Sequence, residues 1–216
     1  MNKPLNKYID HTLLKPDATK EEIENLCNEA KEYDFYSVCV NSTWVPFAKS
    51  LLDGTDVKIA AVTGFPLGAM ITEAKAYETE VAAREGASEI DMVINIGALK
   101  SKDYETVETD IAEVVKAAAK YDAIVKVILE TGLLTKNEIV EACKLSERAG
   151  AHFVKTSTGF GHGGAEIENV KLMRESVSEK VDVKASGGIR DKETALKMIE
   201  AGAGRIGTSS GIKIVE

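Results

Sequence analysis

The sequence predicts an α/β protein built as a (β/α)8 TIM barrel, with a single domain spanning residues 1–216. Two observations lead to this fold class. Eight short runs of β-branched and other apolar residues recur along the chain, and most are separated by a stretch with the apolar periodicity of a helix. Successive runs begin between 21 and 34 residues apart, which is the length of one strand, one helix and two short loops.

The expected strands are rich in valine, isoleucine and other apolar residues. In chain order they lie at residues 8–14, 36–41, 58–64, 89–95, 123–130, 152–158, 182–188 and 203–209. No proline-rich or serine-rich linker separates the repeated units. We therefore expect them to form one closed barrel with its helices on the outside.

The clearest helical stretches have apolar residues at three- and four-residue spacing. They lie at residues 20–33, 71–86, 104–121, 136–150 and 192–202. Three of them end in glycine, at Gly86, Gly150 and Gly202, where a helix commonly closes with a residue in the left-handed conformation. These signals place helices after the first, third, fourth, fifth and seventh strands.

An open, doubly wound sheet is the alternative architecture, because it also alternates strands and helices. Such a sheet would bind its ligand where the strand order reverses, and a phosphate-binding glycine fingerprint in the first unit would favour it. The matching glycines, Gly159, Gly161 and Gly164, fall instead in the sixth unit. We therefore expect neither a nicotinamide nor a flavin cofactor.

Charge and composition limit the classes of partner and location. The 35 acidic residues against 27 basic ones give a net charge of −8, which disfavours a surface for nucleic acid or anionic lipid. The first residues lack the apolar core of a signal peptide, and no run approaches the ~18 apolar residues of a membrane span. We therefore expect a cytoplasmic protein that acts on small molecules.

Cysteines and histidines are too scattered to suggest a disulfide framework or a metal site. Cys27, Cys39 and Cys143 include no Cys-x-x-Cys pair, and the three histidines show no metal-ligand spacing. We expect reduced thiols, no metal and no other cofactor.

Charged residues on the expected strands are informative, because both faces of a parallel barrel strand are covered. A charge on such a strand must point into the barrel interior or its open mouth. By the alternation of strand side chains, polar residues share a face on five strands. The pairs are Asp10 and Thr12, Asp91 and Asn95, Lys126 and Glu130, Lys155 and Ser157, and Lys184 and Ser186.

Two of these lysines predict amine chemistry. Lys155 and Lys184 lie on neighbouring strands at similar depth, and neither has an acid two or four residues further along its strand. Two close ammonium groups are costly in a pocket of low dielectric, so one should lose its proton near neutral pH and become a nucleophile that attacks carbonyls. Lys126 is expected to form a structural ion pair with Glu130, and a catalytic role for Lys126 stays open.

Glycine-rich segments after the last two strands predict a phosphate site. Barrels of this kind often bind phosphate with the loops after the seventh and eighth strands and the N-terminus of the helix that follows. The residues expected to bind are Gly187, Gly188, Gly207, Ser209 and Ser210. The alternative is that these glycines only form tight turns. A serine-hydrolase reading of GTSSG fails, because no histidine follows it.

Five motifs occur together in the chain: IDHTLLKPDAT, EIDMVINIG, FVKTSTGF, DVKASGG and GTSS. With them the sequence resembles the deoxyribose-phosphate aldolase family over nearly its whole length. The resemblance implies a (β/α)8 barrel, no metal, and a homodimer or homotetramer. It also implies reversible cleavage of 2-deoxy-D-ribose 5-phosphate into acetaldehyde and D-glyceraldehyde 3-phosphate.

The resemblance also assigns roles to residues, motif by motif. It makes Lys155 the Schiff-base lysine and Asp91 a proton donor and acceptor. Lys184 becomes the second lysine, which lowers the proton affinity of the first and assists the proton relay. The residues expected to support this site are Asp10, Thr12 and Lys126.

Two features depart from the family pattern. Phe160 stands where some members carry a lysine near the phosphate, and the chain stops at Glu216 without the tyrosine-ending tail of some members. Both bear on phosphate affinity and on the speed of proton transfer. Cys39 faces inward by parity and is expected to have a packing role. Two other functions stay open: a different phosphosugar enzyme, such as an isomerase or another Schiff-base aldolase, and a non-catalytic phosphosugar-binding protein.

Overall fold

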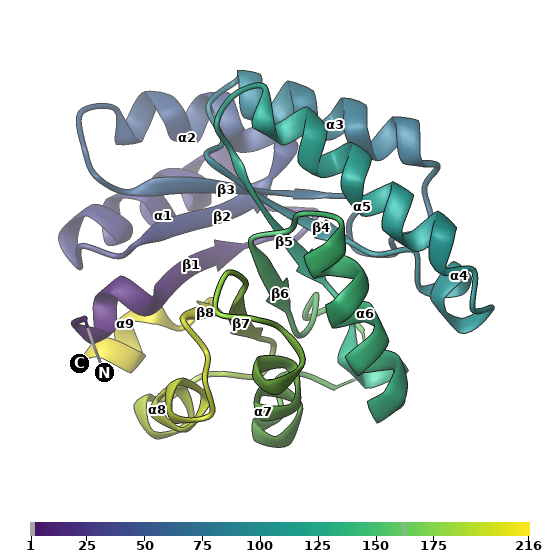
Figure 1. Ribbon diagram of the computed structural model, residues 1–216. Coiled ribbons are helices and arrows are strands. Elements are labelled where there is room, and N and C mark those ends of the chain that lie inside the picture. The colour runs from purple at the N-terminus through teal and green to yellow at the C-terminus, as the bar shows by residue number, and fades with distance from the viewer. Residues whose placement is uncertain (1–2, 162) are drawn as a thin grey trace.

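The computed structural model describes residues 3–161 and 163–216, and within them eight parallel strands close into a barrel (Figure 1). The strands follow one another around the barrel in chain order, and the last pairs with the first. They are β1 (Ile9–Leu13), β2 (Ser37–Asn41), β3 (Lys58–Thr63), β4 (Glu89–Val93), β5 (Ile124–Ile128), β6 (Phe153–Lys155), β7 (Asp182–Ser186) and β8 (Arg205–Thr208). The predicted barrel is confirmed, and the open doubly wound alternative is wrong because this sheet closes on itself.

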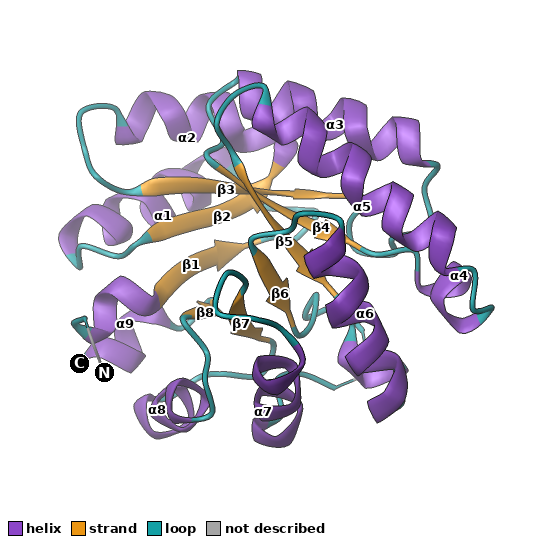
Figure 2. Cartoon of the chain, viewed as in Figure 1, coloured by secondary structure: helices purple, strands orange, loops and turns teal. Residues whose placement is uncertain are grey.

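Figure 2 shows the α-helices arranged around the outside of the strands. They are α1 (Lys20–Glu32), α2 (Val45–Leu52), α3 (Thr72–Arg84), α4 (Ile96–Lys100), α5 (Tyr104–Ala119), α6 (Lys136–Arg148), α7 (Ile167–Ser176), α8 (Lys192–Glu200) and α9 (Gly211–Val215). Short 3₁₀ helices cover Leu5–Tyr8, Ser42–Trp44 and Thr131–Leu133. The five helices predicted from periodicity are all present, within two residues of their expected ends. Of the helices described, none is both long and apolar enough to cross a lipid bilayer.

Local sequence signals explain where several helices begin and end. At the start of α1, the Thr19 hydroxyl accepts a hydrogen bond from the Glu22 backbone N–H, and the Glu22 carboxylate accepts one from the Thr19 N–H. The same capping arrangement opens α6. After α3, α6 and α8 the predicted closing glycines Gly86, Gly150 and Gly202 have φ of 121°, 86° and 111°, which glycine adopts without steric cost.

Two apolar regions hold the barrel together. The larger one fills the space between strands and helices, where residues such as Ile90 and Val125 are completely buried. Each fully buried aliphatic side chain of this kind contributes about 1.5–3 kcal/mol. A smaller cluster lies apart from it and consists of Leu14, Cys39, Ala60 and Val62, with Phe65 packed against them. The completely or almost completely buried charged residues of the strands face the barrel interior, where they form the candidate site.

Candidate active site

Strand register brings the predicted site residues to similar depths in the barrel. Asp91 on β4 pairs with Lys126 on β5, and Lys155 on β6 pairs with Lys184 on β7. All four side chains are almost completely buried. Because side chains alternate along a strand, neighbouring residues of this register face the same interior.

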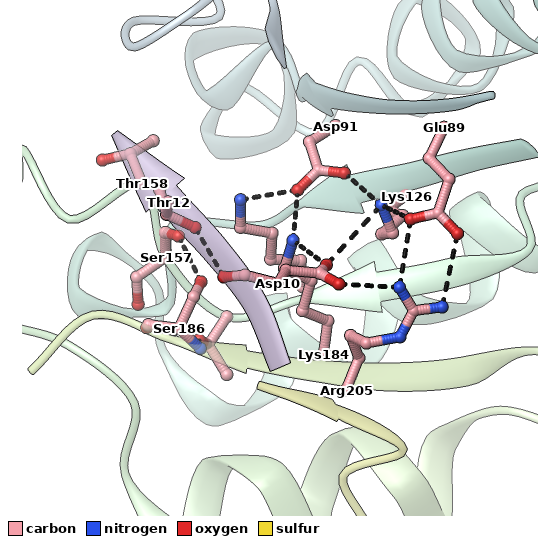
Figure 3. A network of polar contacts seen from close by, with 12 residues as sticks. Asp10, Thr12, Glu89, Asp91, Lys126, Ser157, Thr158, Lys184, Ser186 and Arg205 are labelled. Carbon is pink, nitrogen blue, oxygen red and sulfur yellow. Dashed lines mark hydrogen bonds and ion pairs between the residues drawn. The ribbon is translucent and has the colours of Figure 1, made fainter. Parts of the chain in front are cut away.

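Asp91 is the centre of the cluster drawn in Figure 3. Its Oδ2 accepts hydrogen bonds from Lys155 Nζ and Lys184 Nζ, both at 2.8 Å, and its Oδ1 accepts one from Lys126 Nζ at 2.6 Å. Burial by itself raises the pKa of Asp91, but the three ammonium groups outweigh burial and hold that pKa well below its usual value. Asp91 is therefore a carboxylate that orients three lysines.

The two lysines predicted to lie close together differ in their partners. Lys184 Nζ contacts a second carboxylate, Asp10 Oδ2, at 2.5 Å. Burial lowers the pKa of Lys184, but Asp10 and Asp91 together outweigh burial and raise that pKa above its usual value. Lys184 therefore keeps its proton.

Lys155 has Asp91 as its one carboxylate contact within the described residues. Burial lowers the pKa of Lys155, and the charge of Lys184 lowers it further, so that the attraction of Asp91 does not restore the usual value. Of the three lysines that contact Asp91, Lys155 is thus the one that gives up its proton most readily.

The predicted ion pair between Lys126 and Glu130 is wrong. Lys126 Nζ contacts Glu89 Oε2 and Asp91 Oδ1, both at 2.6 Å. The prediction fails because β5 ends at Ile128 and Glu130 has a left-handed backbone with φ of 57°, so strand alternation does not extend to it. The Glu130 carboxylate instead accepts hydrogen bonds from the Thr158 N–H, at 3.3 Å, and from the Thr158 hydroxyl.

Two buried charges that sequence reasoning missed lie beside this cluster. Arg205, on β8, donates from Nη1 to Asp10 Oδ1 at 2.7 Å and to Glu89 Oε2 at 3.1 Å. A second nitrogen, Nη2, donates to Glu89 Oε1 at 3.3 Å. The signal was present, because Glu89 shares its strand face with Asp91, two residues away, and Arg205 shares one with Gly207.

A cleft of about 250 Å³ opens over Lys155 and reaches the glycine-rich loops. Of the residues predicted to bind phosphate, it is lined by Gly187, Gly188, Gly207 and Ser209. Ser210 is not among the lining residues, and its N–H donates to the Thr208 hydroxyl at 2.9 Å. A Cβ at position 207 would lie 2.9 Å from the Cβ of Ser186 and 3.0 Å from Lys184 Cε, so glycine lets β8 approach the lysine closely.

Thr12 and Asp10 take different places in the site. Thr12 lines the cleft, and its hydroxyl donates to the Asp10 backbone carbonyl at 2.8 Å. The Asp10 carboxylate is completely buried behind Lys184. Two exposed cations that were not predicted, Lys15 and Arg190, also line the cleft and give it a positive rim.

Phe160 and Cys39 differ in their relation to the cleft. Phe160 lines the cleft with 51% of its surface exposed and packs edge-on against Phe65, with ring centroids 5.3 Å apart. Cys39 is completely buried in the small apolar cluster, and burial raises the pKa of its thiol, which agrees with a packing role. Over residues 3–161 and 163–216, no three His, Cys, Asp or Glu side chains form a group that could hold a metal ion.

A (β/α)8 barrel with a readily deprotonated lysine under an open cleft is typical of one class of protein, the enzymes that use a lysine amine as nucleophile on carbonyl substrates. The comparisons give the family within this class. Residues 5–216 match the profile of the DeoC/LacD family aldolases, and the chain belongs to this family. The family resemblance found in the sequence is confirmed.

Known deoxyribose-phosphate aldolases are similar in sequence to this chain over almost its entire length. The deoxyribose-phosphate aldolase of Brevibacillus brevis is 63% identical over 211 residues, covering 98% of this chain and 95% of the relative. That of Thermococcus kodakarensis is 62% identical and covers 100% of this chain and 98% of the relative. Among solved structures, the tetrameric deoxyribose phosphate aldolase from Aeropyrum pernix superposes with a TM-score of 0.91 at 37% identity, covering 98% of this chain and 89% of that one.

Proposed function

We propose that this protein is a metal-independent aldehyde-lyase of deoxyribonucleotide breakdown. It reversibly cleaves 2-deoxy-D-ribose 5-phosphate into acetaldehyde and D-glyceraldehyde 3-phosphate. The observation that carries the proposal is the arrangement of Lys155, which is buried at the base of the cleft and shares one carboxylate oxygen with the protonated Lys184. That arrangement favours the neutral amine, the form that attacks an aldehyde.

The reaction begins when the Lys155 amine adds to the C1 aldehyde of the open-chain sugar. The proton relay protonates the carbinolamine hydroxyl, which leaves as water and gives a protonated imine. A base then removes the proton of the C3 hydroxyl, the C2–C3 bond breaks, and its electron pair moves into the imine to form an enamine. Glyceraldehyde 3-phosphate leaves, the enamine is protonated at C2, and water releases acetaldehyde and the free amine.

Asp91 and Lys184 are proposed as the proton relay for these steps. Asp91 lies 2.8 Å from the nitrogen that becomes the imine, so it can accept and return protons there directly or through one water molecule. Lys184 donates to the same oxygen and stays charged through its contact with Asp10. In the resting enzyme its charge disfavours protonation of Lys155, and during the reaction its ammonium group can lend a proton to Asp91 and then recover it.

The phosphate end of the substrate is proposed to lie at the glycine-rich side of the cleft. Gly187 and Gly188 line the cleft with φ of 91° and 78°, which glycine adopts without steric cost, and Ser209 can donate its hydroxyl. Lys15 and Arg190 at the rim add positive charge. We propose that these two cations act in place of the lysine that Phe160 replaces.

Further proposals concern the setting of the enzyme. We propose that the whole chain acts as one barrel domain in a homo-oligomer, supported by the tetrameric relative from Aeropyrum pernix. A cytoplasmic location is supported by Cys27, Cys39 and Cys143, which are all unpaired and buried, as is usual in reducing compartments.

The test is covalent trapping with acetaldehyde and borohydride, followed by intact mass measurement and peptide mapping. We expect one reduced ethyl adduct on Lys155 in the wild type and none there in Lys155→Ala. Lys192→Ala, an exposed lysine on α8, is the matched control and should be labelled at Lys155 like the wild type. An adduct that maps elsewhere, or no adduct on folded protein, would overturn the proposal.

Donor selectivity separates the proposal from a related aldolase. Incubation of D-glyceraldehyde 3-phosphate with acetaldehyde should give deoxyribose 5-phosphate, whereas acetone or dihydroxyacetone should give little product. Preference for a ketone donor would favour another Schiff-base aldolase, and binding of the phosphosugar without turnover would favour a non-catalytic protein.

A further inference from the structure

The ionised side chains of the barrel interior form one continuous network that extends well beyond Asp91. Lys126 joins Asp91 to Glu89 through two contacts of 2.6 Å. Arg205 then joins Glu89 to Asp10, and Asp10 contacts Lys184, which returns to Asp91. Figure 3 shows this closed circuit of dashed contacts, of which Lys184 is a member.

The network holds one more positive than negative group when all its members are ionised. The cations are Lys126, Lys155, Lys184 and Arg205, and the anions are Asp10, Glu89 and Asp91. None of the seven residues is more than 3% exposed. A buried cluster with net charge is costly, so release of one proton, which makes the network neutral, is favoured.

The contacts decide which group releases that proton. Arg205 does not deprotonate in proteins. Lys126 contacts Glu89 and Asp91 closely and Asp10 at 3.9 Å, and Lys184 contacts Asp10 and Asp91, so each is held by at least two carboxylates. Lys155 has one such contact, with Asp91. The excess positive charge of the whole network therefore acts on Lys155.

The other groups near the two ends of the network do not change this balance. Lys155 faces Cys39 as well as Asp91 and Lys184, and burial raises the pKa of the Cys39 thiol, so it stays uncharged. Arg205 stacks on the ring of Tyr36, with Cζ 3.5 Å from the centroid, and lies 5.4 Å from that of Phe153.

One further cation lies near Arg205 without joining the network. Lys3 is half-buried, and burial followed by the charge of Arg205 lowers its pKa, while Asp182 acts in the opposite direction. Lys3 Nζ donates to the Gly204 carbonyl at 3.0 Å. Among the described residues, Arg205 has ion pairs with Asp10 and Glu89 alone.

We propose that Arg205 and Glu89 are positioning residues for the aldolase reaction, and that the balance of their two charges keeps Lys155 in its neutral, reactive form. Neither residue touches the cleft or Lys155, and both act through Asp10, Lys126 and Asp91. The inference rests on the proposed function, in which Lys155 is the nucleophile.

Single replacements should move the acidic limb of the kcat/KM profile in opposite directions. Arg205→Met leaves three cations against three anions, so Lys155 holds its proton more tightly and the limb should move to higher pH by about one unit. Glu89→Gln leaves four cations against two anions, so the limb should move to lower pH by a similar amount.

The double variant Arg205→Met/Glu89→Gln separates charge from structure. It loses every contact between the two side chains, yet it restores an excess of one positive charge, as in the wild type. We expect its limb to return toward the wild-type position even where its melting temperature is the lowest of the three. A structural role alone predicts cumulative loss of activity with the limb unmoved in all three variants.

A surface ion pair offers a matched control. Arg148 Nη2 contacts Glu108 Oε2 at 2.9 Å, and both side chains are well exposed, at 50% and 37%. Arg148→Met and Glu108→Gln change the total charge in the same way as the interior variants. Because solvent screens these charges, their pH limbs should coincide with that of the wild type.

Borohydride trapping distinguishes failure of this inference from failure of the proposed function. If wild-type Lys155 forms no adduct, the proposed function fails. If Lys155 is trapped in every variant but Arg205→Met and Glu89→Gln shift the limb in the same direction, or not at all, the inference is overturned. Should Arg205→Met not fold, Arg205→Gln removes the same charge while keeping hydrogen-bond donors, and the isosteric Glu89→Gln tests the opposite sign.

Discussion

Replacement of Lys184 by methionine tests how the interior charges prepare Lys155. Both ammonium nitrogens lie 2.8 Å from Asp91 Oδ2, so they are no more than 5.6 Å apart, twice that distance. At an effective dielectric constant of about 20, two unit charges 5.6 Å apart repel by about 3 kcal/mol, which is a factor of about 100 in a protonation equilibrium. This repulsion is lost in the variant.

The sign of the effect follows from the form of Lys155 that reacts. Without the repulsion Lys155 holds its proton more tightly, so the neutral amine is populated only at higher pH. We expect kcat/KM at pH 7 to fall by about 100-fold and the acidic limb of its pH profile to move to higher pH. The fold should survive, because Asp10 keeps its contact with Arg205 at 2.7 Å.

The assay is cleavage of deoxyribose 5-phosphate across a pH series, with glyceraldehyde 3-phosphate measured by a coupled oxidation. The rate of borohydride trapping on Lys155 at each pH reports protonation independently of turnover. Lys184→Arg keeps the charge and should leave the limb close to its wild-type position. Loss of activity in Lys184→Met with an unmoved limb and normal trapping would refute the electrostatic reasoning and leave Lys184 as a proton donor only.

Three other substitutions test separate parts of the structure. Gly207→Ala places a Cβ 3.0 Å from Lys184 Cε and should lower both kcat and the free energy of unfolding, the latter by about 1–3 kcal/mol in a denaturant titration; full stability would contradict the close approach. Phe160→Lys should lower KM for deoxyribose 5-phosphate by up to about fivefold and leave unphosphorylated deoxyribose unaffected, so equal changes for both would exclude a phosphate contact. In the wild type Lys75 Nζ lies 2.6 Å from the buried Asp110 carboxylate, and Lys75→Met leaves that carboxylate without its cation. The substitution should lower the free energy of unfolding by about 3–5 kcal/mol while the folded enzyme stays active. An unchanged melting temperature would contradict this.

Sequence information alone was sufficient for the fold and for the centre of the candidate site. Strand and helix periodicities are local properties, and their eightfold repetition leaves the closed barrel as the simplest way to cover both faces of every strand. The proximity of Lys155 and Lys184 was predictable for the same reason, because they occupy equivalent positions on consecutive strands.

Contacts that depend on closure or on irregular backbone required the folded structure. Arg205 and Asp10 are 195 positions apart and meet because β8 pairs with β1, which no local pattern reveals. Lys126 was assigned the wrong partner because the left-handed backbone at Glu130 interrupts strand alternation. The charge balance of the interior depends on all the strands that supply these groups, and the proposed reactivity of Lys155 depends on that balance. Electrostatic interactions in a low-dielectric interior vary with three-dimensional distance and not with position along the chain, so only the folded structure reveals them.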